Sequence, residues 1–452
     1  MTVGGLPRSV DVAIIGGGLS GLAAAVQLAS NGAGVALLEQ SSKLGGRCYS
    51  YIDEKTGDVV DNGQHILLGA YHNTIKYLNI VGTRGFLREQ PALSLPFHHP
   101  IKGFAEFKIS SLPQPFQLAG GILKFRILSL RDRQKLFNVG LALRRWSKRL
   151  EKNLSSLTVA EWLIELNQSE ASRRCFWYPI AVSVMNELPE RASALLFARS
   201  LKSAFLGTPS DSAVLIPTRG QTELYVHGAE KLLFKNNAKI LTGAKVESIE
   251  TSRSKTITIK FQDGERLEAQ QVISAIPYFA LEKIIPSTYR DEEPFSNLGI
   301  FESSPIVSIH LWFDREFMPQ KYIGLIGKHL QWIFNRRKIM SEEGKSTSYI
   351  SAVISGAYDV VDLAKEKLVA IALQDMRDVY PESRAAKLLH SIVIKEKRAT
   401  FSPTNNIEPF RPSAETPIQN FFLAGDWTNT GLPATIEGAV MSGFNAAKLA
   451  SG

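Results

Sequence analysis

Four residues near the start of the chain have the types and spacing needed to bind a dinucleotide. Gly16, Gly18 and Gly21 follow the GxGxxG spacing, and Glu39 stands further along. In such a turn the first glycine permits the tight bend, the second lets the backbone approach a pyrophosphate, and the third lets a helix pack against a strand. A carboxylate placed like Glu39 can accept hydrogen bonds from ribose hydroxyls. These residues therefore predict cofactor binding rather than a simple turn.

The elements expected around these residues support that interpretation. Residues 12–15 are a β-branched, apolar run typical of a buried parallel strand. Residues 20–30 are rich in Ala and Leu and predict a helix, whose N-terminus at Ser20 would offer free N–H groups to an anion. Residues 35–39 predict a second strand that ends at the acidic residue. The order strand, turn, helix, strand makes the prediction stronger than a lone glycine-rich turn.

Two further segments carry phosphate-binding chemistry. Gly45, Gly46 and Arg47 follow the second predicted strand, and a guanidinium is planar and always charged, which suits phosphate. Near the other end of the chain, Gly425 and Asp426 follow an apolar, strand-like run. One cofactor site built from both ends of the chain explains both segments.

Together these segments resemble the amine-oxidase and carotene-desaturase superfamily. The resemblance implies FAD, with Arg47 at the diphosphate, Asp426 at the ribityl and pyrophosphate region and the backbone of Val246 at the adenine. The helix that begins at Ile436 would direct its N-terminus to the isoalloxazine carbonyl and stabilise negative charge on the reduced flavin. The residues expected at FAD are Gly16, Gly18, Leu19, Ser20, Gly21, Glu39, Gly45, Gly46, Arg47, Val246, Gly425, Asp426 and Ile436.

Composition is that of an ordinary globular protein, with 452 residues, 44% hydrophobic and 21% charged. Cys48 and Cys175 are the two cysteines, which suggests no disulfide framework and a reducing cytoplasm. We expect no cleaved leader, because the first strand begins by Asp11, and no membrane span, because no apolar run reaches about 18 residues. The chain carries one dinucleotide fingerprint, so we expect no separate nicotinamide domain, and no metal site is predicted.

The motifs predict an α/β fold with a discontinuous, Rossmann-like FAD-binding domain of the glutathione-reductase type and an inserted α+β substrate domain. The middle part of the FAD-binding domain would hold a helix over 223–235 and strands near 238–243, 246–249, 256–261 and 271–277. The predicted FAD-binding segments are 1–90, 216–284 and 401–452, and the predicted substrate-domain segments are 91–215 and 285–400.

Residues 122–152 mix basic and apolar side chains. Ten basic residues stand against two acidic ones, a local balance of 10 − 2 = +8 within a chain of net charge +9. This mixture favours contact with an anionic membrane surface. Ordinary helices with solvated basic faces are the alternative. Nucleic acid is the third interpretation of a basic patch, but no nucleic-acid motif accompanies it, so no nucleic-acid partner is expected.

The stretch DNGQHILLGAY at residues 61–71 resembles the hydroxysqualene dehydroxylases, the squalene-associated FAD-dependent desaturases of bacterial hopanoid biosynthesis. Plant-type phytoene and ζ-carotene desaturases carry a related version. The resemblance implies reductive removal of the hydroxyl of hydroxysqualene to give squalene, with reduced FAD as hydride donor. It also implies a hydrophobic isoprenoid substrate, contact with upstream squalene or hydroxysqualene synthase enzymes, and a cytoplasmic protein peripheral to the inner face of the cytoplasmic membrane.

That reaction needs an acid for the leaving hydroxyl and a dry site for an allylic cation. His65 is the first candidate acid, because an imidazolium can donate a proton near neutral pH, and Asp61 is the second, with Gln64 in the same site. A structural hydrogen bond for His65 and a structural cap for Asp61 are the alternatives. Aromatic rings that could stabilise the cation, each also a candidate for ordinary packing, are Phe176, Trp177, Tyr178, Trp312, Phe313 and Trp427.

Two other functions stay open. A carotenoid desaturase would run the hydride transfer in the opposite direction. A flavin-containing scaffold subunit of a membrane isoprenoid-synthase complex is a different class, and the intact glycine, Arg47 and Asp426 motifs argue against it. An amine oxidase is disfavoured because no cysteine stands near the C-terminal motif for covalent flavin attachment.

Overall fold

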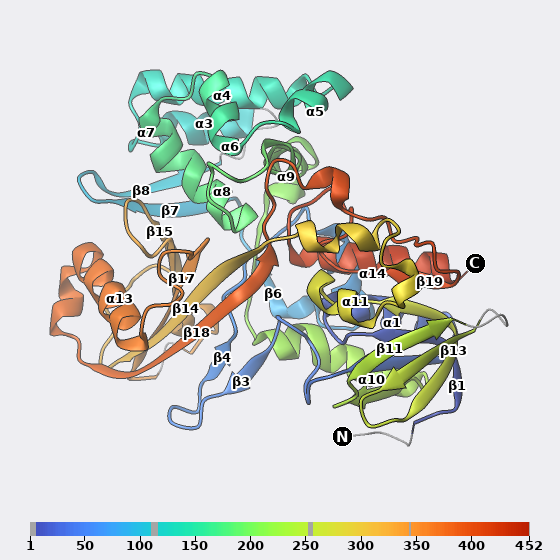
Figure 1. The fold of residues 1–452 in the computed structure, drawn as a ribbon. Coiled ribbons are helices and arrows are strands. Elements are labelled where there is room, and N and C mark those ends of the chain that lie inside the picture. Colours follow the sequence, from blue (N-terminus) through green and yellow to red (C-terminus); the bar gives the residue numbers. More distant parts are fainter. Residues whose placement is uncertain (1–5, 110–115, 252–255, 343–344, 452) are drawn as a thin grey trace.

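The fold is that of a computed structural model, in which the structure describes residues 6–109, 116–251, 256–342 and 345–451. Two large β-sheets, two small sheets and a group of helices make up the described part of the molecule (Figure 1). One sheet carries the glycine-rich turn and lies close to both chain ends, and the other lies beneath the helices that Figure 1 draws in cyan and green.

The first sheet has a parallel centre. β1, β2, β10 and β19 run parallel to their neighbours, whereas β11 and β12 add an antiparallel edge next to β13. It draws its strands from the three segments predicted to build the FAD-binding domain, although the exact limits of those segments stay predictions. Across the sheet the order is β10 (Lys239–Thr242), β2 (Val35–Glu39), β1 (Ser9–Ile15), β13 (Arg266–Ser274), β12 (Ile257–Phe261) and β11 (Val246–Thr251), and β19 (Phe421–Leu423) pairs with the end of β13.

Side chains of β1 alternate between two apolar cores. Val12 and Ile14 pack on the face that is covered by α1 (Leu19–Ser30) and α14 (Ile436–Ala450). Ala13 and Ile15 pack on the opposite face, with α11 (Tyr278–Ile284). This burial on both faces explains why the strand is a continuous apolar run.

The first and last long helices cross backbone to backbone. A Cβ atom on Gly443 of α14 would lie 2.1 Å from the carbonyl oxygen of Ser20 on α1, so only glycine permits this approach. Figure 1 shows α14, in red, lying along α1. The crossing attaches the C-terminal flavin segment to the helix that follows the glycine-rich turn.

The second sheet is built mainly around a long antiparallel pair, β14 and β18. Its core lies between the sheet and α13 (Lys365–Val379). The order is β18 (Leu388–Phe401), β14 (Ser303–Phe313), β17 (Ser348–Ser355), β16 (Trp332–Asn335), β15 (Tyr322–Leu325), β7 (Ser94–His99) and β8 (Gly103–Lys108).

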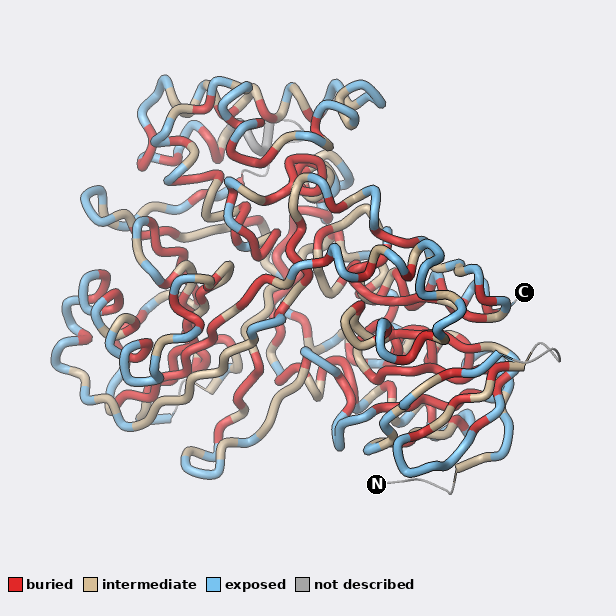
Figure 2. The backbone as a smooth tube through the Cα atoms, viewed as in Figure 1, coloured by how far each residue is buried: buried red, intermediate tan, exposed pale blue. Residues whose placement is uncertain are grey.

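Helices between β8 and β9 pack into one apolar core that also reaches β7. Phe176 and Trp177 are buried in this core. Figure 2 shows these helices alternating between buried and exposed turns, as expected for helices with one face on a core. They are α3 (Phe116–Lys124), α4 (Leu130–Arg144), α5 (Lys148–Leu154), α6 (Val159–Glu165), α7 (Glu170–Ser172), α8 (Tyr178–Met185) and α9 (Ala194–Leu206).

Two small sheets position the 61–71 segment. The hairpin of β3 (Ser50–Ile52) and β4 (Val59–Asp61) ends at the start of this segment. Leu67 and Leu68 then form β5, which pairs with β9 (Val214–Pro217), and β9 also pairs with β6 (Leu87–Glu89). The segment is therefore held at both of its ends.

The predicted elements are present, with one difference in the middle segment. The helix predicted over 223–235 begins with a π-helical turn, Thr222–Val226, and continues as α10 (His227–Lys235). The turn follows Gln221, whose backbone N–H binds the carboxylate of Asp61. Within the described parts of the chain, no helix combines the length and apolar character needed to cross a membrane.

Candidate functional site

The glycine-rich turn and the Gly-Gly loop form one backbone surface. Gly45 donates its N–H to the carbonyl of Gly17 at 2.8 Å, and Gly45 forms a parallel bridge with Gly18. Gly45 has φ +102°, a conformation that L side chains rarely adopt, so the loop needs glycine there. A Cβ on Gly18 would meet nothing closer than Gly46 Cα at 4.0 Å. The open space lies at the N-terminus of α1, where backbone N–H groups favour an anion.

Glu39 supports the turn from the end of β2. Its Oε2 accepts from the N–H of Gly17 at 2.7 Å and its Oε1 accepts from the N–H of Ser41 at 2.8 Å. Ala244 donates to the carbonyl of Glu39 at 2.9 Å, which brings the start of β11 at Val246 to this end of the sheet. The structure thus groups Glu39 and Val246 where the sequence places the ribose and adenine, and their contacts with FAD stay predictions.

Arg47 and Asp426 join the two ends of the chain. Arg47 Nη2 lies 2.9 Å from Asp426 Oδ2, and Arg47 Nη1 donates to the carbonyl of Ala399 on β18 at 2.5 Å. Asp426 raises the pKa of Arg47, although burial opposes the rise. The Arg47 side chain is 41% exposed whereas that of Asp426 is 10% exposed. A charged guanidinium therefore faces the open part of the site, as diphosphate binding requires.

A buried arginine holds the loop that carries Asp426. Arg411 donates to the backbone carbonyls of Asp426 at 3.0 Å, Thr428 at 2.5 Å and Leu432 at 2.8 Å, and it pairs with Glu408. Sequence reasoning missed Arg411, because recognition of carbonyls by one arginine leaves no pattern in the sequence. Its contacts fix the loop from β19 to α14.

The start of α14 is tied to the segment that follows residue 71. Glu437 accepts four hydrogen bonds of 2.8–2.9 Å from the backbone and side chains of Asn73 and Thr74, in the first turn of α2 (His72–Ile80). Thr435 caps α14 by accepting from Gly438 N at 3.0 Å, so Ile436 is the first helical residue, as predicted. A carboxylate at the N-terminus of α2 is electrostatically favourable.

Arg336 gathers two of the predicted catalytic residues. It is 1% exposed, lies 2.8 Å from Asp61 Oδ2 through Nη2, and donates to Gln64 Oε1 through Nη1. The second oxygen of Asp61 accepts from Gln221 N at 3.0 Å. Burial raises the pKa of Asp61, while Arg336 and Gln221 oppose the rise. Since both carboxylate oxygens face N–H donors, the geometry favours the structural role of Asp61 over a proton-donating one.

His65 lies beside the same cluster. Burial, together with the positive charge of Arg47, lowers the pKa of His65 to about 4. The imidazole is therefore uncharged at neutral pH in this structure. An imidazolium acid at His65 stays a prediction, because burial and the charge of Arg47 both favour the neutral imidazole.

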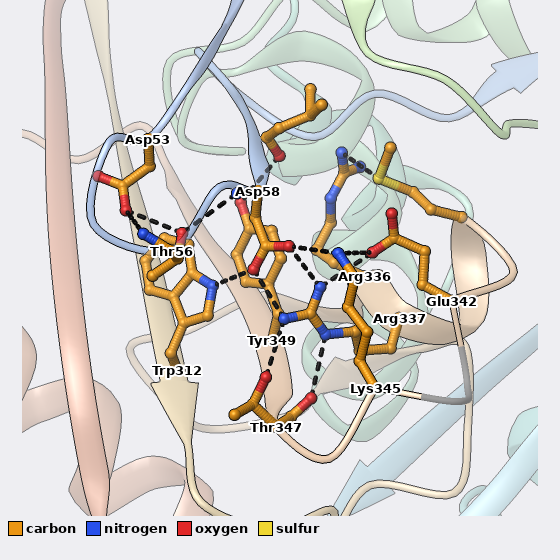
Figure 3. Close-up of polar contacts among 12 residues, drawn as sticks. Asp53, Thr56, Asp58, Trp312, Arg336, Arg337, Glu342, Lys345, Thr347 and Tyr349 are labelled. Carbon is orange, nitrogen blue, oxygen red and sulfur yellow. Dashed lines mark hydrogen bonds and ion pairs between the residues drawn. The ribbon is translucent and has the colours of Figure 1, made fainter.

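A second buried ion cluster holds the β3–β4 hairpin against the second sheet, as Figure 3 shows. Asp58 accepts from Arg337 at 2.6 Å and 2.7 Å, from Lys345 at 2.8 Å and from the indole of Trp312 at 2.8 Å. Arg337 and Asp58 side chains are 5% and 3% exposed. Burial alone would raise the pKa of Asp58, but these hydrogen bonds outweigh burial and lower it to about 2.

The aromatic candidates have packing partners. Trp312 stacks on Tyr349 with ring centroids 4.4 Å apart, and Phe313 lies in the core under α13. Trp427 is 2% exposed and donates to the carbonyl of Ile276 at 3.1 Å. The ordinary packing role is therefore evident for these rings, and no cation-stabilising role follows from their positions.

Comparison with known proteins identifies the family of the chain. Residues 19–450 match the family of flavin containing amine oxidoreductases. The chain is 28% identical to a hydroxysqualene dehydroxylase of Sinorhizobium fredii, over 98% of this chain and 99% of the relative. It is 24% identical to a 15-cis-phytoene desaturase of Synechococcus elongatus, over 96% of this chain and 94% of the relative. An oxidoreductase structure from Methanosarcina mazei has a TM-score of 0.75 at 17% identity, with 97% of this chain and 100% of that chain covered.

The fold and the glycine cradle define a flavoprotein whose cofactor site is closed by both ends of the chain. The chain belongs to the flavin-containing amine oxidoreductase family and is an FAD-dependent oxidoreductase. The residues present suit FAD, because the open backbone at Gly18 and the exposed charge of Arg47 provide complementary contacts for a diphosphate.

The open space at Gly18 generates a prediction. Gly18→Ala should abolish flavin binding while changing the free energy of unfolding by less than about 1 kcal/mol, because the new methyl group occupies cofactor space and meets no protein atom within 4.0 Å. Flavin absorbance and thermal unfolding of the purified variant measure both effects. Gly85→Ala, where an added Cβ also meets nothing within 4 Å, is the matched control and should stay yellow. A Gly18→Ala protein with full flavin content would contradict the assignment of this cradle.

The cluster around Asp58 generates a second prediction. Asp58→Asn should lower the free energy of unfolding by about 3–5 kcal/mol, because it leaves the buried guanidinium of Arg337 without its main counter-charge. Asp362→Asn, which breaks a solvent-exposed pair with Lys397, should have a much smaller effect, because water screens that pair. Chemical denaturation of the two variants compares them directly, and equal losses would show that leaving the buried Arg337 without this partner is not costly.

The same cluster sets a pH dependence. The pKa of Asp58 is lowered from 3.8 to about 2, so its stabilisation is present at neutral pH and is lost as the pH falls from 3.8 through about 2. The difference in free energy of unfolding between wild type and Asp58→Asn should therefore shrink as the pH falls through that range, and chemical denaturation at each pH measures it.

Proposed function

We propose that the protein removes the hydroxyl group of hydroxysqualene to give squalene. The observation that carries the proposal is the nearly full-length similarity to hydroxysqualene dehydroxylases. The 61–71 segment supports it, because this stretch resembles that family and contacts the Gly-Gly-Arg loop through the hydrogen bond from Asn62 to the carbonyl of Arg47. One dinucleotide fingerprint is present, so the electrons for FAD would come from a separate donor.

The chemistry requires the chain to hold the cofactor, to position the 61–65 segment and to supply a proton. When bound, reduced FAD supplies a hydride. Arg47 and the backbone of the Gly18 cradle bind and orient the cofactor, and the N-terminus of α14 favours negative charge near its own first turn. Arg336 fixes the 61–65 segment through Asp61 and Gln64. The remaining requirement is a proton for the departing oxygen.

We also propose that the protein docks on an anionic membrane through a smaller surface than residues 122–152. Most apolar side chains in that range are core, and Leu123, Leu130 and Leu141 are the exposed leucines there. Ile101, at the tip of the β7–β8 hairpin, is 89% exposed, and its neighbour Lys102 donates to the carbonyl of Ile127. This contact brings the hairpin tip to the turn between α3 and α4. Exposed basic residues of the same region are Lys124, Arg126 and Arg131.

The reaction can be tested by the direction of hydride transfer. Anaerobic protein with photoreduced FAD should convert hydroxysqualene to squalene, with flavin reoxidised in step with product. Oxidised protein should leave phytoene unchanged. Product analysis and flavin absorbance check both results. Desaturation of phytoene by the oxidised protein, with no reaction of hydroxysqualene, would instead support the carotenoid desaturase to which the chain is also similar.

Membrane docking predicts a charge-dependent interaction with vesicles. Reversing Lys124, Arg126 and Arg131 to Glu should weaken sedimentation with anionic vesicles by about 1 kcal/mol for each residue that reaches the surface. Neutral vesicles should bind far less wild-type protein. The matched control reverses three exposed lysines of the FAD-binding domain, Lys235, Lys283 and Lys448. Equal loss in both triple variants would reject a specific docking surface and indicate an effect of net charge.

A further inference from the structure

Glu396 is a carboxyl group on the face of β18 that lies toward the candidate site. Ile392 and Ile394, which precede it at alternate positions, pack beside the β3–β4 hairpin around Val60. Lys395 and Lys397 instead bind groups near α13, on the other face of the strand. Because side chains alternate along a strand, Glu396 shares the face of the two isoleucines.

The register of β14 and β18 places this face against the 61–65 segment. Glu396 is paired with Ile306, and Ile394 with Ser308. A Cβ on Gly63 would lie 3.4 Å from the Ser308 hydroxyl oxygen. Ile394 is thus paired with the residue that contacts the 61–65 segment, and Glu396 is the next residue on the same face of β18.

The immediate neighbours of Glu396 belong to the cofactor site. Asn62 donates to the carbonyl of Arg47 at 2.9 Å and, as a neighbour of Glu396, acts to lower the pKa of that carboxyl against the larger effect of burial. Arg47 in turn binds Ala399, further along β18. Glu396 is half-buried, and it shares its face of β18 with the apolar side chains of Ile392 and Ile394. Its charged and titratable neighbours are Arg47 and Tyr49.

Burial favours the protonated form of this carboxyl. It raises the pKa of Glu396, although Arg47 and Asn62 oppose the rise. Only the protonated form can give a proton to a leaving oxygen, since a protonated carboxyl is a donor and a carboxylate is not.

We propose that Glu396, rather than His65 or Asp61, gives the proton to the hydroxyl group that leaves the substrate. This inference rests on the proposed function. Asp61 faces donors at both oxygens, and His65 is uncharged, whereas Glu396 lies in the same region with a partly exposed carboxyl.

The proposed step is balanced. The C–O bond of the alcohol breaks as the Glu396 proton moves to the departing oxygen, which leaves as water. Reduced FAD, which the Gly18 cradle and Arg47 would hold, would supply the hydride for the new C–H bond. The alcohol is reduced to the hydrocarbon, the flavin is oxidised, and Glu396 becomes a carboxylate that takes its next proton from solvent.

The test compares Glu396→Gln with Glu366→Gln, an exposed glutamate on α13. Both proteins are loaded with FAD, photoreduced and mixed anaerobically with hydroxysqualene. Glu396→Gln should keep flavin and slow its reoxidation about 10²- to 10⁴-fold, and Glu366→Gln should match wild type. The wild-type rate should fall as pH rises through the pKa of Glu396, because the protonated form is the active one, and the Gln variant should lose this dependence.

An infrared measurement provides a readout independent of turnover. At neutral pH, wild type and Glu366→Gln should show the C=O stretch of a protonated carboxyl that is missing from Glu396→Gln. Absence of such a difference would overturn the proposal.

Kinetic outcomes separate this proposal from the proposed function. If wild type consumes hydroxysqualene and Glu396→Gln does so equally fast, Glu396 is not the donor, and the proposed function stands. If wild type leaves hydroxysqualene unchanged, the proposed function fails and the Glu396 step fails with it. Should the Gln variant lose flavin, Glu396→Asp decides: pH-dependent turnover supports a carboxyl donor, and turnover independent of pH overturns it.

Discussion

The ion pair between Arg47 and Asp426 is the contact on which the rest of the site depends. Each residue follows a glycine turn on a different end of the chain, and the pair brings these turns to one place. Arg47 also binds the carbonyl of Ala399, so the same guanidinium contacts the strand that carries Glu396. A change at this pair would alter cofactor binding and the position of the second sheet together.

The electrostatics of the site follow from that one exposed cation. Arg47 lowers the pKa of His65 and opposes the rise in the pKa of Glu396, so it influences both groups considered for proton transfer. Arg336 and Arg337, in contrast, are buried, and each is paired with a buried carboxylate. Buried pairs of this kind contribute little net stability, but losing one partner is costly, so they define how the hairpin meets the second sheet.

The sequence allowed prediction of features that depend on local spacing. Gly18, Glu39 and Arg47 stand within short motifs whose physical roles are known, and the structure places them together. Arg336 and Arg411 could not be predicted in this way, because their partners are distant in sequence and include backbone carbonyls.

The helical segments illustrate a second limit. Residues 122–152 alternate apolar and basic side chains, and this pattern alone does not distinguish a membrane-contacting face from a helix that packs on a core. The structure buries Phe125 and Leu136 and exposes Leu123 and Leu130. Burial here depends on α9 and the β7 strand, which no local pattern reveals.

The crossing of α1 and α14 has a consequence for synthesis of the protein. A ribosome makes the glycine-rich turn early, but the helix that covers the same face of the sheet is made hundreds of residues later, and translation proceeds at about 5–20 residues per second. Until then the apolar side of α1 has no α14 to cover it, and Arg47 has no Asp426. FAD therefore meets a complete site only after α14 has been made and has packed on α1.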